Sequence, residues 1–324
     1  MLKEKLLELL ATYANDFFSG EKLATQLGVS RAMVWKLIQK LQEDGFEIKS
    51  VHKKGYRLLE NEKLSEYFIR WHLCDGILSD IVVLDETDST MNEAKQGALH
   101  NLATPALFIT NKQLQTRGRF GRQYFSEDSG HGVYMSLLLQ PDVLFSELPQ
   151  YTILAAVAVV KAIEQFTNKQ PRIKWVNDIY FGNQKFCGIL SEATGDMQTS
   201  HVSSIIIGIG LNYAIESFPD EIAHKATSLF LADDKRSITR NQLIAEIWNQ
   251  FFLWQERDFL SEYKRYSFVL GKEVAFVKKG VEYRGVAMNI NDSGELIVAG
   301  ADEIFTLSSG EISLTEIDGR VLRR

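Results

Sequence analysis

The chain has 324 residues, more than one ordinary hydrophobic core organises, so two or three domains are expected. Hydrophobic residues make up 45% and charged residues 24%, the balance of a soluble globular protein. The formal net charge is −6, so any binding to nucleic acid would require a local basic surface. The two cysteines, Cys74 and Cys187, are far apart and have no metal-ligand spacing, which favours a reducing compartment.

The sequence contains no recognisable export or membrane segment. Its N-terminus lacks the apolar core and cleavage site of a signal peptide. The longest apolar run, Ile153 to Val160, is too short to cross a bilayer. We therefore expect a cytoplasmic protein without a membrane partner.

Three helices are predicted at the start of the chain. The first has apolar residues at helical spacing, namely Leu2, Leu6, Leu9, Leu10 and Tyr13. Ser19 can cap a second helix over Gly20 to Leu27. Ser30 can cap a third, which runs to about Asp44. The second and third are joined by a short turn containing glycine, which is the helix-turn-helix pattern.

A basic hairpin follows these helices. The strands expected at Phe46 to Val51 and Tyr56 to Leu59 enclose His52-Lys53-Lys54-Gly55 and would form the wing of a winged helix. From Ser30 to Arg57 there are seven Lys or Arg residues and three acids. In this fold the third helix would enter the major groove and the wing would meet phosphates. The predicted DNA-binding residues are Ser30, Arg31, Lys36, Lys40, Lys53 and Lys54. The alternative is that these charges form an ordinary solvated surface.

Strands and helices alternate from about Leu64 to Leu260. Strands are predicted at Ile81 to Leu84, Ala106 to Thr110, Val133 to Leu139, Arg172 to Trp175, Asp178 to Phe181, Lys185 to Ile189 and Ile205 to Ile209, with a long helix around Glu147 to Phe166. Hairpin-like neighbours favour a mixed or largely antiparallel sheet. The sequence has neither a Walker motif nor GxGxxG, which argues against a P-loop NTPase and a Rossmann dehydrogenase.

A loop rich in arginine and glycine lies between Gln113 and Tyr124. Its three arginines, Arg117, Arg119 and Arg122, occur within six positions and are separated by glycines. Glycine lets the backbone approach a ligand, and each charge-assisted bond from arginine contributes roughly 1.5–3 kcal/mol. The pattern is typical of an anion site that holds a nucleotide triphosphate. The alternative is a flexible basic loop or an RNA contact.

A second polar segment, Lys174-Trp175-Val176-Asn177-Asp178, precedes Lys185 and the apolar strand after it. Burying such groups without a purpose would be costly. A lysine at the edge of a closed site can offset charge that develops on a carboxylate attacking phosphorus. Lys185 could instead be a hairpin-turn lysine. Asp178 could be a metal ligand or a structural carboxylate that orients a neighbour.

The last fifty-six residues are expected to form a small antiparallel barrel. Strands are predicted at Glu273 to Lys278, Glu282 to Ile290, Leu296 to Ala299 and Ile304 to Leu307, with turn signals between them. Small barrels often serve as binding modules, so carrier docking, closure over a nucleotide and simple stabilisation all stay open.

Taken together, these motifs resemble the family of bifunctional biotin–protein ligases and biotin-operon repressors. The resemblance covers the whole chain and rests on ordered motifs: Val34 to Lys36, Thr87 to Asn92, Gln113 with Arg117 to Arg122, Lys174 to Asp178, Lys185 to Leu190, Gly208 to Asn212 and Ala226 to Leu229. It implies an α+β chain with a winged helix-turn-helix over 1–62, a mixed-sheet ligase domain over 63–268 and an SH3-like domain over 269–324.

The resemblance also implies a two-step reaction. The carboxylate of biotin attacks the α-phosphate of MgATP, which gives biotinyl-5′-AMP and pyrophosphate. A lysine amine of the biotin carboxyl carrier protein of acetyl-CoA carboxylase then attacks the mixed anhydride and releases AMP. The adenylate would also be the corepressor, favouring a homodimer that binds operator DNA.

Site residues carry over by their match to the family motifs. The catalytic residues implied are Lys185 and Arg119. Biotin would be bound by Ser89, Thr90, Gln113, Arg117, Gly118, Arg119, Lys185 and Gly188. ATP and the adenylate would be bound by Arg117, Arg119, Arg122, Tyr124, Asn177 and Asn212. The ligands of the Mg²⁺ ion are not indicated.

The sequence departs from the family pattern at three positions. Thr116 replaces the first glycine of the loop, Tyr124 replaces a tryptophan, and Val176 replaces a proline. None removes a charged group, so we expect activity to survive. Three other functions stay open. They are a ligase whose winged helix-turn-helix, here called the head, does not read DNA, a ligand-sensing repressor without ligase activity, and a lipoate-type ligase.

Overall fold

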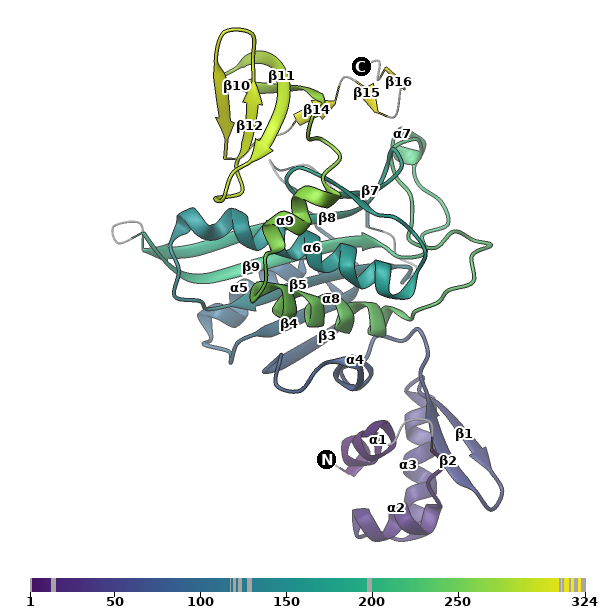
Figure 1. The fold of residues 1–324 in the computed structure, drawn as a ribbon. Helices are drawn as coiled ribbons and strands as arrows, with labels where there is room; N and C mark the ends of the chain where they lie inside the picture. The colour runs from purple at the N-terminus through teal and green to yellow at the C-terminus, as the bar shows by residue number, and fades with distance from the viewer. Residues whose placement is uncertain are drawn as a thin grey trace. The chain divides into compact units, whose positions relative to one another are not determined.

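The structure is a computed structural model that describes residues 2–12, 16–116, 118, 121, 124–126, 130–196, 200–308, 310, 312–314, 316–317 and 320–321 (Figure 1). The chain forms two compact units. One consists of Met1–Cys74 with Ile238–Ala245, and the other of Asp75–Ser237 with Glu246–Arg324. Among the described residues, none of the helices has the length and apolar content needed to span a membrane.

The first unit contains a winged helix-turn-helix, as predicted. Its elements are α1 (Leu2–Thr12), α2 (Gly20–Leu27), α3 (Arg31–Glu43), β1 (Glu47–Val51), β2 (Gly55–Leu59) and α4 (Glu66–His72). The hydroxyls of Ser19 and Ser30 cap α2 and α3 by accepting from the amides of Lys22 and Met33. The buried face of α3 is the predicted one, Val34, Leu37, Ile38 and Leu41. β1 and β2 pair antiparallel and form the wing.

The turn of the wing is held in a restricted conformation. Gly55 has φ +106°, and a Cβ there would lie 1.8 Å from the Phe18 carbonyl oxygen, so only glycine fits. Lys53 has φ +65°, a region that side-chain-bearing residues seldom occupy. Lys53 therefore occupies a backbone conformation that glycine would adopt with a smaller steric free-energy cost. Such positions often carry a function.

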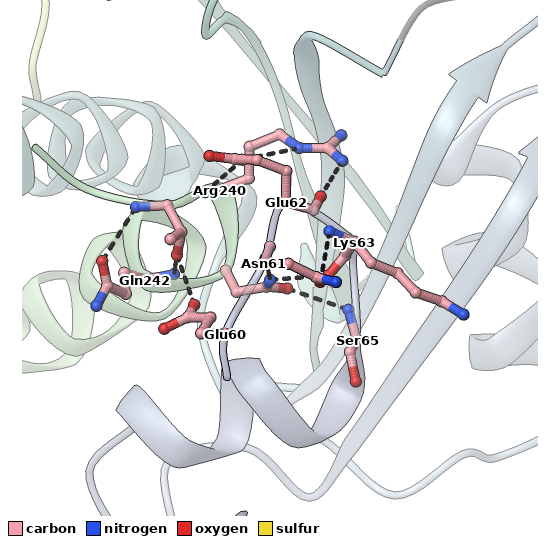
Figure 2. Close-up of polar contacts among 9 residues, drawn as sticks. Glu60, Asn61, Glu62, Lys63, Ser65, Arg240 and Gln242 are labelled. Atoms are coloured by element: carbon pink, nitrogen blue, oxygen red, sulfur yellow. Dashed lines mark hydrogen bonds and ion pairs between the residues drawn. The ribbon is translucent and has the colours of Figure 1, made fainter. Parts of the chain in front are cut away.

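A buried polar cluster joins the segment after the wing to the first turn of α8 (Arg240–Gln255) (Figure 2). The amide of Asn241 donates to the Lys63 carbonyl at 2.9 Å and accepts from the Ser65 amide at 3.1 Å. The Arg240 guanidinium donates to the Glu62 carbonyl. Because Asn241 and Arg240 are almost fully buried, these bonds satisfy groups that would otherwise lose water without replacement.

The second unit is built on a seven-stranded mixed sheet. Its strands are β3 (Asp80–Thr87), β4 (Ala106–Gln113), β5 (Gly132–Leu139), β6 (Arg172–Lys174), β7 (Asp178–Phe181), β8 (Gln184–Asp196) and β9 (His201–Asn212). The order is β3-β4-β5-β9-β8-β7-β6. Only the β3–β4 pair is parallel among these described strands, which confirms the predicted mixed sheet. β8 and β9 extend well beyond the predicted segments.

Helices cover the two faces of this sheet (Figure 1). On one face lies α6 (Leu148–Phe166), whose Thr152 hydroxyl donates to Ser191 of β8; α9 (Phe259–Tyr266) packs against α6. On the other face lies α5 (Thr90–Leu99), which packs on Phe108, Leu138 and Ile206. Two short helices, η2 (Phe145–Glu147) and α7 (Asp220–Ala223), lie in connecting segments.

The C-terminal segment forms an all-antiparallel sheet of five strands. They are β10 (Glu273–Lys278), β11 (Val281–Ile290), β12 (Leu296–Ala299), β13 (Ile304–Leu307) and β14 (Ile312–Leu314), in the order β13-β12-β11-β10-β14. The first four strands lie where the sequence predicts them. β15 (Glu316–Ile317) and β16 (Arg320–Val321) form a separate pair. The sheet is confirmed, and its closure into a barrel stays a prediction.

Candidate functional site

The candidate site is a cavity of about 210 Å³ over the face of the sheet that α5 covers in part. In the β8–β9 ladder Gly188 pairs with Gly210, and Leu190 pairs with Gly208. Paired residues of antiparallel strands point to the same face, so these four residues share one surface. Three of the four lack a side chain, and the cavity occupies the space that side chains would fill.

The glycines also allow close approach from other segments. A Cβ on Gly208 would lie 2.8 Å from the Met91 sulfur, and one on Gly210 would lie 3.0 Å from the Tyr124 ring. A Cβ on Gly188 would lie 3.0 Å from the Lys185 Nζ. Met91, Tyr124 and Lys185 can therefore occupy their positions only because the three glycines have no side chains.

Lys185 reaches this surface because of a β-bulge. The β7–β8 register runs from Ile179 opposite Cys187 to Tyr180 opposite Lys185, which leaves Phe186 as the extra residue. Without this shift Lys185 would point to the face that α6 covers. Bulges commonly redirect a side chain beside an active site. The side chain of Lys185 lies at the wall of the cavity.

Lys185 forms an ion pair with Asp178. The Lys185 Nζ lies 2.6 Å from the Asp178 Oδ1, and their side chains are 32% and 24% exposed. Asp178 is paired with Gly188 across the strands, so it belongs to the same face. Of the two roles that the sequence left open for Asp178, the observed contact is that of a carboxylate orienting a neighbour.

The main chain of Lys185 is fixed on both sides. Its amide donates to the Lys225 carbonyl at 2.8 Å, and its carbonyl accepts from the Thr227 amide at 3.0 Å. The Asn212 Nδ2 donates to the Thr227 carbonyl, and the Asn212 Oδ1 accepts from the Tyr124 hydroxyl, both at 2.9 Å. Burial raises the pKa of the Tyr124 phenol well above its usual range, which keeps this donor protonated.

Neutral hydrogen-bonding groups gather at another wall of the cavity. The Gln113 Oε1 accepts from the Thr90 amide at 2.9 Å and from the Thr90 hydroxyl at 3.1 Å. The Thr90 hydroxyl also lies 2.8 Å from the Ser136 hydroxyl. Ser89 precedes α5 as its N-cap residue and lines the cavity. This wall suits a ligand with uncharged donors and acceptors.

The Trp175–Asn177 turn forms a third wall. The Trp175 indole is only 3% exposed, and its N–H donates to the Gly294 carbonyl at 3.0 Å. The peptide bond between Trp175 and Val176 is cis. The Asn177 Nδ2 donates to the Ile189 carbonyl at 2.8 Å. Residues of the C-terminal segment also belong to this wall. Gly294 contacts Trp175, and Gly310 and Ile312 line the cavity.

The structure brings most predicted ligand-binding residues together. The cavity is lined by Ser89, Thr90, Gln113, Gly118, Tyr124, Asn177, Lys185 and Gly188. Asn212 is absent from the described lining, because its side chain instead holds Tyr124 and Thr227. Arg117, Arg119 and Arg122 lie outside the described residues. Within the described ranges, no three His, Cys, Asp or Glu side chains form a metal-holding group.

The sequence gives no individual role to five residues that build the site, although four of them lie in the motifs that carry the family resemblance. They are Met91, Ser136, Gly208, Gly210 and Thr227. Two glycines at alternate positions of an apolar strand, Gly208 and Gly210, were the available signal, because a strand interior seldom contains glycine without a close approach. Ser136 gave no comparable signal, since its role depends on pairing with a distant strand.

The predicted DNA-binding residues all lie exposed on the first unit. Arg31, Lys36 and Lys40 are on α3, and Lys53 and Lys54 are in the turn of the wing. Ser30 caps α3 through its hydroxyl. A helix and a hairpin tip thus present basic side chains to solvent, as a winged helix that binds DNA requires.

Comparison with known proteins identifies each part of the chain. Residues 3–57 match an HTH domain, residues 83–212 the biotin/lipoate A/B protein ligase family, and residues 269–315 the biotin protein ligase C terminal domain. The bifunctional ligase/repressor BirA of Bacillus subtilis (strain 168) is 36% identical over 97% of this chain and 98% of its own length. The chain belongs to the BirA family of bifunctional ligase/repressors.

More distant relatives agree with this membership. BirA of Escherichia coli (strain K12) is 28% identical over 95% of this chain and 96% of its own length. A solved biotin protein ligase from Aquifex aeolicus, in complex with biotin and ATP, is 25% identical with a TM-score of 0.61. The match covers 73% of this chain and 98% of that one. The family membership and the predicted fold class are therefore confirmed, and the predicted domain bounds stay predictions.

Gly188→Ala tests the requirement for the glycine surface. The added methyl would meet the Lys185 Nζ and Cε, at 3.0 and 3.2 Å, and should displace the ammonium group from Asp178. We expect roughly 10²-fold lower ligase activity, because small misplacements of a reacting group are costly. The free energy of unfolding should change by less than about 1 kcal/mol, because the displaced atoms end a flexible side chain.

The matched control is Gly20→Ala, whose added methyl makes only an ordinary contact 3.5 Å from Tyr56 in the first unit. It should leave ligase activity unchanged. Activity is measured as biotin incorporated per minute, and stability by urea unfolding. Full activity in Gly188→Ala would show that the close approach of Lys185 is unnecessary.

Proposed function

We propose that this member of the BirA family is an ATP-dependent biotin–protein ligase that also acts as a transcriptional repressor. The observation that carries the enzymatic half is the cavity itself. One wall offers neutral hydrogen-bonding groups, another is apolar, and a fixed lysine stands at its edge. These three features match the ureido ring, the aliphatic chain and the reactive carboxylate of biotin.

Biotin would lie with its ureido ring against Ser89, Thr90 and Gln113. The Thr90–Gln113 bonds hold these side chains in place before the ligand arrives, which lowers the entropic cost of binding. Trp175 and Leu190 would contact the aliphatic chain. The carboxylate would then lie near Lys185, and Gly118 and Gly188 would allow the backbone to approach it closely.

In the first step a carboxylate oxygen of biotin forms a bond to the α-phosphorus of MgATP, and the bond to the pyrophosphate oxygen breaks. Negative charge passes onto oxygens that Lys185 can contact. Arg119 is the second catalytic residue that we propose, and Arg117 and Arg122 would neutralise the carboxylate and phosphates. Mg²⁺ would enter with ATP as part of the substrate.

In the second step the amine of a carrier lysine attacks the acyl carbon of biotinyl-5′-AMP. The amine loses a proton, the acyl–oxygen bond breaks, and AMP leaves. Tyr124 would stack on the adenine, and Asn177 would contact the nucleotide. Asn212 would act on the nucleotide through Tyr124, which it holds. The acceptor that we propose is the biotin carboxyl carrier protein of acetyl-CoA carboxylase.

The Lys185→Ala variant tests the proposed catalytic role of Lys185 in biotin transfer. We expect transfer of radiolabelled biotin from MgATP and biotin to a carrier domain to fall by at least about 10²-fold, because one electrostatic contact to the transition state is lost. Lys95→Ala is the matched control. It removes an ammonium group that pairs with Glu192 at 2.6 Å, in a surface ion pair worth little.

Wild-type protein that binds biotin tightly but transfers none would contradict the ligase and favour a ligand sensor. Transfer of lipoate in place of biotin would assign the site to a lipoate-type ligase.

The regulatory half of the proposal is DNA binding by the first unit. We propose that Ser30, Arg31, Lys36 and Lys40 place α3 in the major groove, with Lys53 and Lys54 on phosphates. Lys53 supports this assignment. It retains a side chain at φ +65°, where a glycine would avoid a steric cost of about 1–2 kcal/mol.

Lys53→Gly separates DNA binding from stability. The variant removes one charge and the steric cost together, so the head should unfold no more readily than wild type. We expect weaker binding to every duplex, and the slope of log K against log salt should fall by about one. Lys5→Ala, an exposed substitution on α1, should leave the slope unchanged. An unaltered slope in Lys53→Gly would remove Lys53 from the phosphate contacts.

We further propose that biotinyl-5′-AMP is the corepressor and favours a homodimer that presents two winged helices to a two-part operator. Linkage requires that adenylate and operator strengthen each other's binding. Sedimentation equilibrium should therefore give a larger association constant with adenylate than without it. Equal constants would contradict this coupling and leave a ligase whose head does not regulate.

A further inference from the structure

The exposed side of α3 carries two large apolar side chains, Met33 and Trp35. Trp35 is 54% exposed, and it is the only exposed tryptophan among the described residues. The buried side of the helix is already complete with Val34, Leu37, Ile38 and Leu41. A tryptophan in solvent does not contribute to this core, so its role is expected outside the isolated fold.

Helical spacing places Trp35 toward the wing. Residues seven positions apart lie on the same side of a helix, so Trp35 and Gln42 share one side of α3. The Gln42 Nε2 donates to the Ile48 carbonyl of β1 at 2.9 Å. Trp35 is therefore on the side of α3 that faces the hairpin and close to the outward side that bears Lys36.

The charge around this position identifies what can cover the indole. Lys36 follows Trp35 directly, Arg31 lies one turn before it, and the wing bears Lys53 and Lys54. A partner must therefore combine dense negative charge with an apolar group that fits between the charges. Duplex DNA does so in its major groove, where phosphates flank the C5-methyl group of thymine.

We infer that Trp35 determines sequence preference by covering a thymine methyl group in the major groove. This inference rests on the proposed DNA binding and adds the base that is read. The lysines would supply affinity for any sequence, because phosphates are the same throughout DNA. The indole would supply discrimination, since cytosine and uracil lack this methyl group.

The experiment uses the full chain with biotin and MgATP. Duplexes are first selected from a random pool by wild-type protein. Each thymine of a selected duplex is then replaced in turn by deoxyuridine, which removes only the methyl group. Binding of wild type, Trp35→Ala, Trp35→Phe and Lys54→Ala is measured by fluorescence anisotropy at several salt concentrations.

For wild type we expect at least one deoxyuridine replacement in each half-site to weaken binding by about fourfold, the equivalent of one buried methyl group. The same replacements should have no effect on Trp35→Ala, whose salt slope should equal that of wild type. Trp35→Phe should retain part of the loss of affinity that deoxyuridine replacement causes. Lys54→Ala should bind every duplex more weakly and show the same loss on deoxyuridine replacement as wild type.

Urea unfolding confirms that each variant is folded, and ligase activity should be unchanged, since Trp35 lies outside the cavity. Deoxyuridine penalties that persist in Trp35→Ala would overturn the inference, as would selected duplexes without thymine. A change in self-association of Trp35→Ala with the penalties intact would also overturn it and assign the indole to a protein contact. Wild type that binds no duplex at all would instead refute the proposed DNA binding.

Discussion

Antiparallel pairing between β8 and β9 places Gly188 opposite Gly210 and Leu190 opposite Gly208, and the site depends on this register. A shift by one residue would turn the glycines to the face covered by α6 and fill the cavity with side chains. The same register sets the places of Met91 and Tyr124, which approach the backbone where a Cβ would obstruct them. The cavity is thus a property of strand pairing before it is a property of any single side chain.

The chemistry at the cavity edge follows from one irregularity in that sheet. The bulge at Phe186 turns Lys185 to the glycine face, where Asp178 holds its ammonium group at 2.6 Å. Hydrogen bonds to Lys225 and Thr227 fix the main chain of Lys185. A lysine held on both its backbone and its side chain needs little rearrangement when substrate charge develops, which is the condition for efficient electrostatic catalysis.

The two units of the chain use charge in different ways. At the cavity of the ligase unit, Lys185 is paired with Asp178 and a second wall carries neutral hydrogen-bonding groups, which suits recognition of one small molecule. In the head, Arg31 and Lys36 lie near an exposed indole on α3, and the wing bears two further exposed lysines. That combination suits a long polyanion with small apolar features. A net charge of −6 for the whole chain conceals this local difference.

The sequence by itself determined the head, because helix caps, a glycine turn and apolar spacing are local signals that the structure confirms at Ser19, Ser30 and α3. Most of the ligand-binding residues that it predicted also line the cavity. The proposed roles of Arg117, Arg119 and Arg122 stay predictions. Only the tertiary structure decided that Lys185 faces Asp178, that Gly188 faces Gly210, and that Ser136 meets Thr90. Each of these contacts depends on strand register or on a bulge, and residues distant in sequence fix both.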